Sequence, residues 1–76
     1  MILDNFEFTD CVERFLAVTS MPITTMGRGC NNDPRFVYDL RKGRNYSEKI
    51  KNRVLCFMKK YVTKNNIEFD FNGWRG

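Results

Sequence analysis

The stretch TTMGRGCNNDPRFVYDLRKGR, residues 24–44, has the pattern of two short helices that cross at a tight turn. Where two helices cross closely, the first needs a very small residue on its inner face, and the turn needs a residue that tolerates positive φ. Gly27 supplies the small residue, and Asn31 is of the type, other than glycine, that best accepts positive φ. The second helix must also pack two apolar residues, one turn apart, against the first helix. The residues expected to pack this motif are Gly27, Cys30, Asn31, Val37 and Leu40.

The predicted motif spans residues 23–43. Its first part is rich in glycine and β-branched residues, which are poor helix formers, so only the motif as a whole favours a helix there. The second part has clear signals, because Asp33 is a good N-cap and Pro34 suits the first helical position. Gly43 can end a helix in the left-handed conformation. A helix is therefore expected over residues 33–42.

Two longer helices flank the motif, and an aromatic tail follows them. The apolar spacing predicts one helix over about residues 9–19. A second begins with Ser47 as its N-cap and extends to about Val62. Residues 67–71, IEFDF, alternate apolar and acidic side chains, which predicts a short strand.

The expected fold class is all-α, with a compact bundle of four to five helices. Residues 1–63 form a helix-turn-helix domain, and residues 64–76 form a C-terminal extension that contains the candidate strand. A chain of 76 residues buries only about 60 % of its unfolded surface, so its core is marginal. Small folds often gain stability by oligomerising, and a homodimer is the expected state.

Cysteine and histidine usage argues against metals, disulfides and catalysis. The chain has no histidine, and Cys11, Cys30 and Cys56 lie far apart without a C-x-x-C pair. We interpret all three cysteines as packing residues in a reducing compartment, and we expect no metal and no cofactor. Without histidine there is no Ser-His or Cys-His nucleophile pair, so we do not expect an enzyme.

The positive charge is concentrated in the middle of the chain. Residues 1–27 carry four acidic residues and one arginine, a net charge of −3. Residues 28–64 carry eleven lysines and arginines against three acidic residues, a net charge of +8. This asymmetry favours an anionic partner.

The hydropathy pattern indicates a cytoplasmic protein. The N-terminal sequence has neither the cationic start nor the apolar run of a signal peptide. No stretch approaches the roughly 18 apolar residues that a membrane span requires, so no membrane association is expected.

Together, the motif residues resemble the lambda-repressor-like helix-turn-helix family, which contains small phage and bacterial repressors and Cro-type proteins. The resemblance covers about residues 9–62, and D-P-R-F-V-Y-D-L-R-K-G-R, residues 33–44, is its most specific part. This chain departs from the family at Gly27, where alanine is commoner, and at Asn31, where glycine is. The resemblance implies a homodimeric transcriptional regulator, in the first instance a repressor, that binds palindromic double-stranded DNA.

If the motif binds DNA, residues 33–42 form the helix that enters the major groove. Arg35 is the first candidate for a base contact, because its planar fork matches the O6 and N7 acceptors of guanine. The alternative for Arg35 is an ion pair with Asp39 on a solvated face, and for Tyr38 a partly buried packing role. The expected base contacts are Arg35, Tyr38 and Asp39. The expected phosphate contacts are Arg28, Lys42, Arg44 and Lys49.

The main alternative function is a small protein-interaction module, an inhibitor or antirepressor, that uses the same fold without binding DNA. The tail bears on this alternative, because it carries a large apolar load. Its apolar residues are Ile67, Phe69, Phe71 and Trp74. They either close the core of their own chain, pair with a second copy, or dock another protein.

Overall fold

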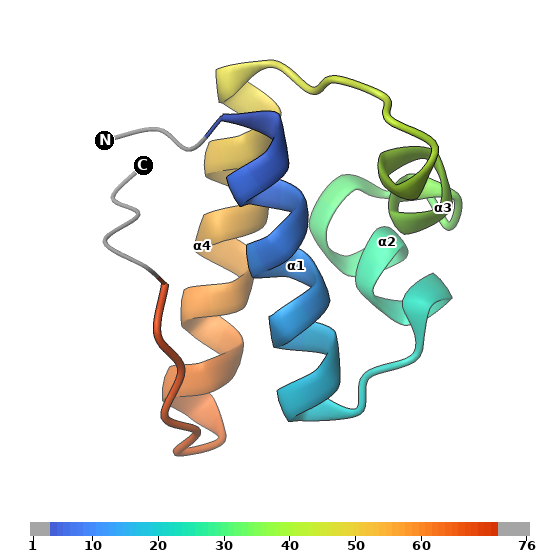
Figure 1. The fold of residues 1–76 in the computed structure, drawn as a ribbon. Coiled ribbons are helices and arrows are strands. Elements are labelled where there is room, and N and C mark those ends of the chain that lie inside the picture. The colour runs from blue at the N-terminus through green and yellow to red at the C-terminus, as the bar shows by residue number, and fades with distance from the viewer. Residues whose placement is uncertain (1–3, 72–76) are drawn as a thin grey trace.

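Two long helices carry the core, and two short helices are attached to one side of them (Figure 1). The computed structural model describes residues 4–71, which contain four helices and no strand. The helices are α1 (Asn5–Thr19), α2 (Ile23–Asn31), α3 (Phe36–Arg41) and α4 (Glu48–Lys64). α1 and α4 run side by side in the same direction, and α3 lies at the outer edge of the molecule, on the far side from α4 (Figure 1). No helix in the described part of the chain is long and apolar enough to cross a membrane.

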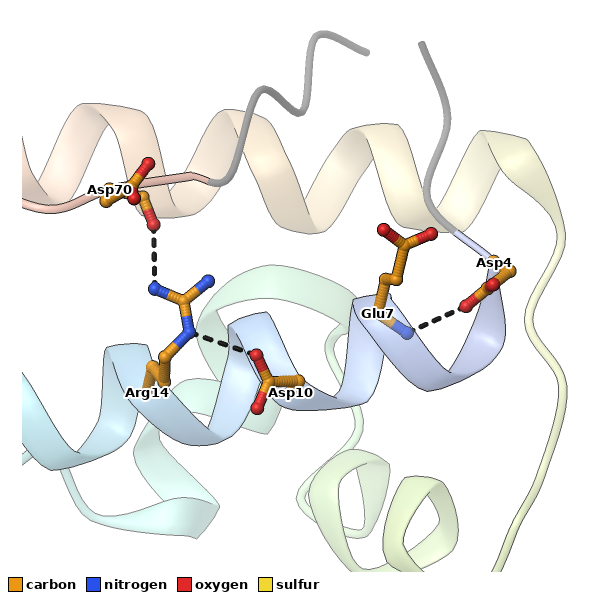
Figure 2. Close-up of polar contacts among 5 residues, drawn as sticks. All are labelled: Asp4, Glu7, Asp10, Arg14 and Asp70. Atoms are coloured by element: carbon orange, nitrogen blue, oxygen red, sulfur yellow. Dashed lines mark hydrogen bonds and ion pairs between the residues drawn. The ribbon is translucent and has the colours of Figure 1, made fainter.

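α1 begins four residues earlier than the sequence predicted. Asp4 is its N-cap, and the Asp4 carboxylate accepts a hydrogen bond from the Glu7 backbone N–H at 2.8 Å (Figure 2). The Asp4 carbonyl also accepts from the Phe8 N–H at 2.9 Å. The expected start at about Thr9 was wrong, because it rested on the apolar spacing and on the acidic residues Asp10 and Glu13 near that position. The Asp-x-x-Glu pattern ahead of the apolar run is a start signal that could have been recognised.

The limits of α4 agree with the sequence prediction within two residues. Ser47 is its N-cap, and the Ser47 hydroxyl accepts from the Ile50 N–H at 3.4 Å. The helix ends at Lys64 rather than Val62. Asn65 follows, and its side-chain amide donates to the Tyr61 carbonyl at 2.9 Å.

All four helices contribute to one apolar core. Phe15 of α1 lies at its centre and makes edge-to-face contacts with Phe57, Tyr61 and Phe69, at ring separations of 6.4, 5.7 and 5.8 Å. Because α3 inserts Phe36 beside Phe8, at a ring separation of 6.3 Å, the same core also holds the outer helix. The buried apolar residues are Phe8, Cys11, Val12, Phe15, Leu16, Met26, Cys30, Phe36, Val37, Leu40, Tyr46, Val54, Leu55, Met58 and Val62.

Residues 67–71 pack against the core of their own chain, which was one of the three alternatives for the tail. They form no strand within the described residues, and pairing with a second copy stays a prediction. The Arg14 guanidinium donates to the Asp70 carbonyl at 2.9 Å (Figure 2). It also lies 5.4 Å from the centre of the Phe69 ring. The Asp10 carboxylate accepts from the same guanidinium at 3.1 Å. Trp74, which we counted with the tail, lies outside the described residues.

Two of the three cysteines pack in the core, as predicted, and the third does not. Cys11 and Cys30 are buried, and burial raises the pKa of each thiol to about 11. Both therefore stay protonated and unreactive at neutral pH. Cys56 is exposed on α4, because the apolar stripe of that helix passes through its neighbours Leu55 and Phe57 instead.

Candidate nucleic-acid interface

α2 and α3 meet at a turn that only a glycine permits. The carbonyl oxygen of Asp33 lies against the Cα of Gly27, so a Cβ at this position would collide with it. The same Cβ would lie 3.2 Å from the Cα of Pro34. The Asp33 N–H in turn donates to the Gly27 carbonyl at 3.1 Å. Gly27 is therefore the close-approach residue that the sequence pattern predicted, and its neighbours in space are backbone atoms.

The left-handed residue of the turn is Asn32, one position later than predicted. Its φ is 51°, and its N–H donates to the Arg28 carbonyl at 3.2 Å. Asn31 is the last residue of α2, and its side-chain oxygen accepts from Arg53 at 3.3 Å. Both residues are asparagines and tolerate positive φ equally well, so the sequence offered no means of choosing between them.

α3 is shorter than residues 33–42, because the chain makes a separate turn before the helix begins. The Asp33 carbonyl accepts from the Phe36 N–H at 3.1 Å, and its carboxylate accepts from the Arg35 N–H at 2.9 Å. Asp33 therefore caps this turn, and the helix starts at Phe36. Arg35 lies at the corner where the turn enters α3. Gly43 ends this region in the left-handed conformation, as predicted, with a φ of 96°.

The inner side of α3 is apolar and fixes the orientation of the helix. Val37 and Leu40 are buried, one turn apart, as the motif requires. Phe36 is also buried, and its ring lies 5.0 Å from that of Tyr46 in the following loop. The side chains on the opposite side of α3 must therefore face solvent.

That opposite side brings together all the predicted base contacts. Arg35, Tyr38, Asp39 and Lys42 line a shallow surface hollow of about 360 Å³. Arg35 and Lys42 are exposed, and Tyr38 is 49 % exposed, so Tyr38 is half-buried and still presents part of its surface to solvent. The helix thus presents two cations, an aromatic hydroxyl and a carboxylate within one small area.

Asp39 does not pair with Arg35, which was the alternative considered for Arg35. Its carboxylate binds the Arg44 guanidinium at 3.2 Å, and the same guanidinium lies 4.9 Å from the centre of the Tyr46 ring. Among residues 4–71, Arg35 forms no ion pair. Its guanidinium is therefore available to a partner, whereas Arg44, an expected phosphate contact, is engaged within the protein.

The other two expected phosphate contacts, Arg28 and Lys49, are not among the residues that line the hollow. Arg28 is exposed in the last turn of α2, next to the turn that leads to α3. Lys49 is exposed on the first turn of α4. The connection over residues 42–47 separates this turn from α3 (Figure 1). Arg28 therefore adjoins, along the chain, the turn that leads to α3, whereas Lys49 belongs to α4.

A structural ion pair that the sequence did not predict holds α3 against α1. The Arg41 guanidinium donates two hydrogen bonds to the Glu13 carboxylate, at 2.7 and 2.8 Å. This interaction lowers the pKa of Glu13 below its ordinary value of 4.5. The two residues are 28 positions apart, so no local sequence pattern could have revealed the pair. Arg41 thereby differs from its neighbours in having a bidentate partner.

Comparison with protein-family models, with curated proteins and with solved structures finds no match. In addition, no group of three or more cysteine, aspartate and glutamate side chains within residues 4–71 is arranged to hold a metal ion.

Proposed function

We propose that this protein is a sequence-specific double-stranded DNA-binding regulator of transcription, acting as a repressor in the phage or bacterial cytoplasm. The single observation that carries the proposal is the exposed side of α3, where Arg35, Tyr38 and Lys42 surround one hollow. These are the residue types that read base edges and bind phosphates.

The position of α3 suits entry into a groove. The major groove of B-DNA is about 12 Å wide and admits an α-helix. α3 lies at the outer edge of the molecule (Figure 1), and its inner side is fixed by Val37 and Leu40. A rigidly held outer helix can present side chains to base edges without a loss of packing. Arg28, in the last turn of α2, is placed to bind the adjacent backbone.

A homodimer completes this proposal. α3 contains only six residues, so one copy could contact only a few base pairs. Two copies related by a two-fold axis would read two half-sites, which lie about 34–36 Å apart in helix-turn-helix complexes. Doubling the contacts in this way gives a small reading helix enough specificity for a genomic target.

One observation favours the alternative of a protein-interaction module. Phe6 on α1 is 82 % exposed, and Val18 on the same helix is 53 % exposed. Exposed apolar side chains of this size are typical of contacts between proteins, although isolated ones are also normal on a soluble surface. A second copy of the chain would equally well cover them, so this observation is compatible with a dimeric regulator.

Replacing Arg35 with alanine is expected to reduce specific DNA binding by about 1–3 kcal/mol, because a bidentate base contact is lost. The measurement is fluorescence anisotropy over a salt series, with the DNA upstream of its own gene and a scrambled duplex. Wild type should prefer the upstream DNA by about a thousandfold or more.

Two further variants serve as controls for this experiment. Arg35→Lys keeps the charge but loses the planar fork, so it should retain binding to the scrambled duplex and lose the preference. Lys60→Ala removes an exposed charge from α4 and should leave the preference intact. If wild type binds neither duplex at low salt, the DNA-binding proposal fails and the interaction module takes its place.

A further inference from the structure

We infer that the Asp39–Arg44 pair suppresses binding to non-matching DNA, by holding Arg44 away from the phosphate backbone and keeping a carboxylate on the reading surface. The inference rests on the proposed function and deepens it, since it concerns how the same surface rejects incorrect sequences.

The backbone at the end of α3 brings the two residues together. The Arg44 N–H donates to the Asp39 carbonyl at 3.1 Å, and the Gly43 N–H donates to the Leu40 carbonyl at 3.0 Å. With Gly43 at a φ of 96°, these two bonds make the chain reverse directly after the helix. The reversal fixes the Cα of Arg44 beside the turn of α3 that carries Asp39.

The side chain of Arg44 is then held in two further ways. Its guanidinium binds the Asp39 carboxylate at 3.2 Å and lies 4.9 Å from the centre of the Tyr46 ring. Tyr46 is itself a fixed platform, because it is buried and its hydroxyl donates to the Phe36 carbonyl at 3.4 Å. Arg44 is thus stacked and ion-paired before any DNA arrives.

This arrangement makes a non-matching duplex unfavourable. The Arg44 side chain is 57 % exposed, and its Nη1 bonds the Asp39 carboxylate. If Arg44 turns fully to a phosphate, it leaves that carboxylate unpaired in the same hollow as Arg35 and Lys42, facing a polyanion. A duplex that offers a base amine, such as cytosine N4, gives the carboxylate a donor and removes this penalty. Discrimination therefore comes from a repulsive element as well as from attractive ones.

Replacing Asp39 with asparagine tests the inference directly. The variant removes the repulsive charge and frees Arg44, so affinity for a scrambled duplex should rise on the order of tenfold near 0.1 M salt. The plot of log affinity against log salt should steepen by about one unit, as expected for one additional phosphate contact.

Two variants show whether a gain in affinity for the scrambled duplex comes from a freed Arg44 or only from the change in net charge. Asp10→Asn makes the same charge change in an aspartate that also pairs with an arginine, Arg14 at 3.1 Å, on α1. It should raise affinity for the scrambled duplex by no more than about twofold, because an exposed charge distant from the interface is screened. Arg44→Ala alone should lower affinity for that duplex, because it leaves the Asp39 carboxylate unpaired in the hollow. In the Asp39→Asn background the same change should remove most of the gain.

The inference is overturned if Asp39→Asn gains no more than Asp10→Asn, or if the gain persists in the Asp39→Asn, Arg44→Ala double variant. Either result, obtained with a wild type that binds its preferred duplex, leaves the proposed function standing. A wild type that binds no DNA overturns both. The ion pair can also be tested without DNA, because the Tyr46 ring current should shift the Arg44 side-chain proton resonances, and Asp39→Asn should move them. Identical Arg44 resonances in wild type and Asp39→Asn would overturn the inference on their own.

Discussion

Gly27→Ala is expected to destabilise the protein by about 2–3 kcal/mol, although alanine is the better helix former by about 1 kcal/mol. The added methyl group would collide with the Asp33 carbonyl oxygen, and would lie 3.2 Å from the Cα of Pro34. Both neighbours are backbone atoms of the turn, so α3 can escape the collision only by moving away from α2. Such a movement would also separate Val37 and Leu40 from the core.

Gly29→Ala is the matched control, because it lies on the same helix and gains the same helix propensity. Its Cβ would meet the far end of the Phe57 side chain, at 2.6 Å from Cε1, and this ring can tilt away. Urea unfolding followed by circular dichroism should therefore show a much smaller change for Gly29→Ala than for Gly27→Ala. Equal stabilities for the two variants would contradict the close crossing of α2 and α3.

Phe15→Ala is expected to cost about 3–5 kcal/mol, the largest effect of any substitution considered. Phe15 is fully buried and contacts one ring of the tail and two of α4. Its removal leaves a cavity where α1, α4 and the tail meet. A domain of this size has a total stability of roughly 5–10 kcal/mol, so the variant should lose from about a third to all of that stability.

Phe6→Ala provides the same chemical change at an exposed position of the same helix. Phe6 is 82 % exposed, so its truncation should change the free energy of unfolding by less than about 0.5 kcal/mol. Thermal unfolding of the two variants beside wild type is the measurement. A Phe15→Ala variant as stable as Phe6→Ala would contradict the placement of Phe15 at the centre of the core.

Local signals predicted the start of α4 and the end of the α3 region, whereas the local start signal of α1 at Asp4 was overlooked and α3 starts later than Asp33 indicated. Ser47 capped α4, Gly43 ended the α3 region, and the all-α class followed from the apolar spacing. The sequence failed where the outcome depended on contacts across the fold. Residues 67–71 have the alternation of a strand. In the structure they contact α1 instead, since Arg14 donates to the Asp70 carbonyl and Phe15 packs against Phe69.

In the candidate interface, too, the sequence predicted the features that depend on local spacing but not the contacts that depend on the fold. The exposure of Arg35 and Tyr38 follows from the helical period once Val37 and Leu40 are taken as the inner side. The partner of Asp39 could not be found in this way, because spacing along a helix favours Arg35, four residues before it. The chain reversal at Gly43 brought Arg44 closer instead. The pair between Arg41 and Glu13 likewise depends on how α3 packs against α1.

These placements give the proposed interface a definite boundary. We propose Arg28, Arg35, Tyr38 and Lys42 as the DNA contacts around α3, whereas Arg41 is bonded to Glu13 of α1. Residues 67–71 of the tail pack against the core, and Arg14 of α1 donates a hydrogen bond to the Asp70 carbonyl (Figure 2). These residues should therefore not take part in DNA binding.

The most direct measurement is an NMR titration of the ¹⁵N-labelled protein with a short duplex at low salt. Non-specific and specific DNA are expected to bind the same surface, so this test does not depend on knowing the operator. We expect the largest amide shifts at Arg28, Arg35, Tyr38 and Lys42, with Phe69 unaffected. No shifts at low salt, or shifts centred on residues 67–71 or on Phe6, would contradict DNA binding through α3.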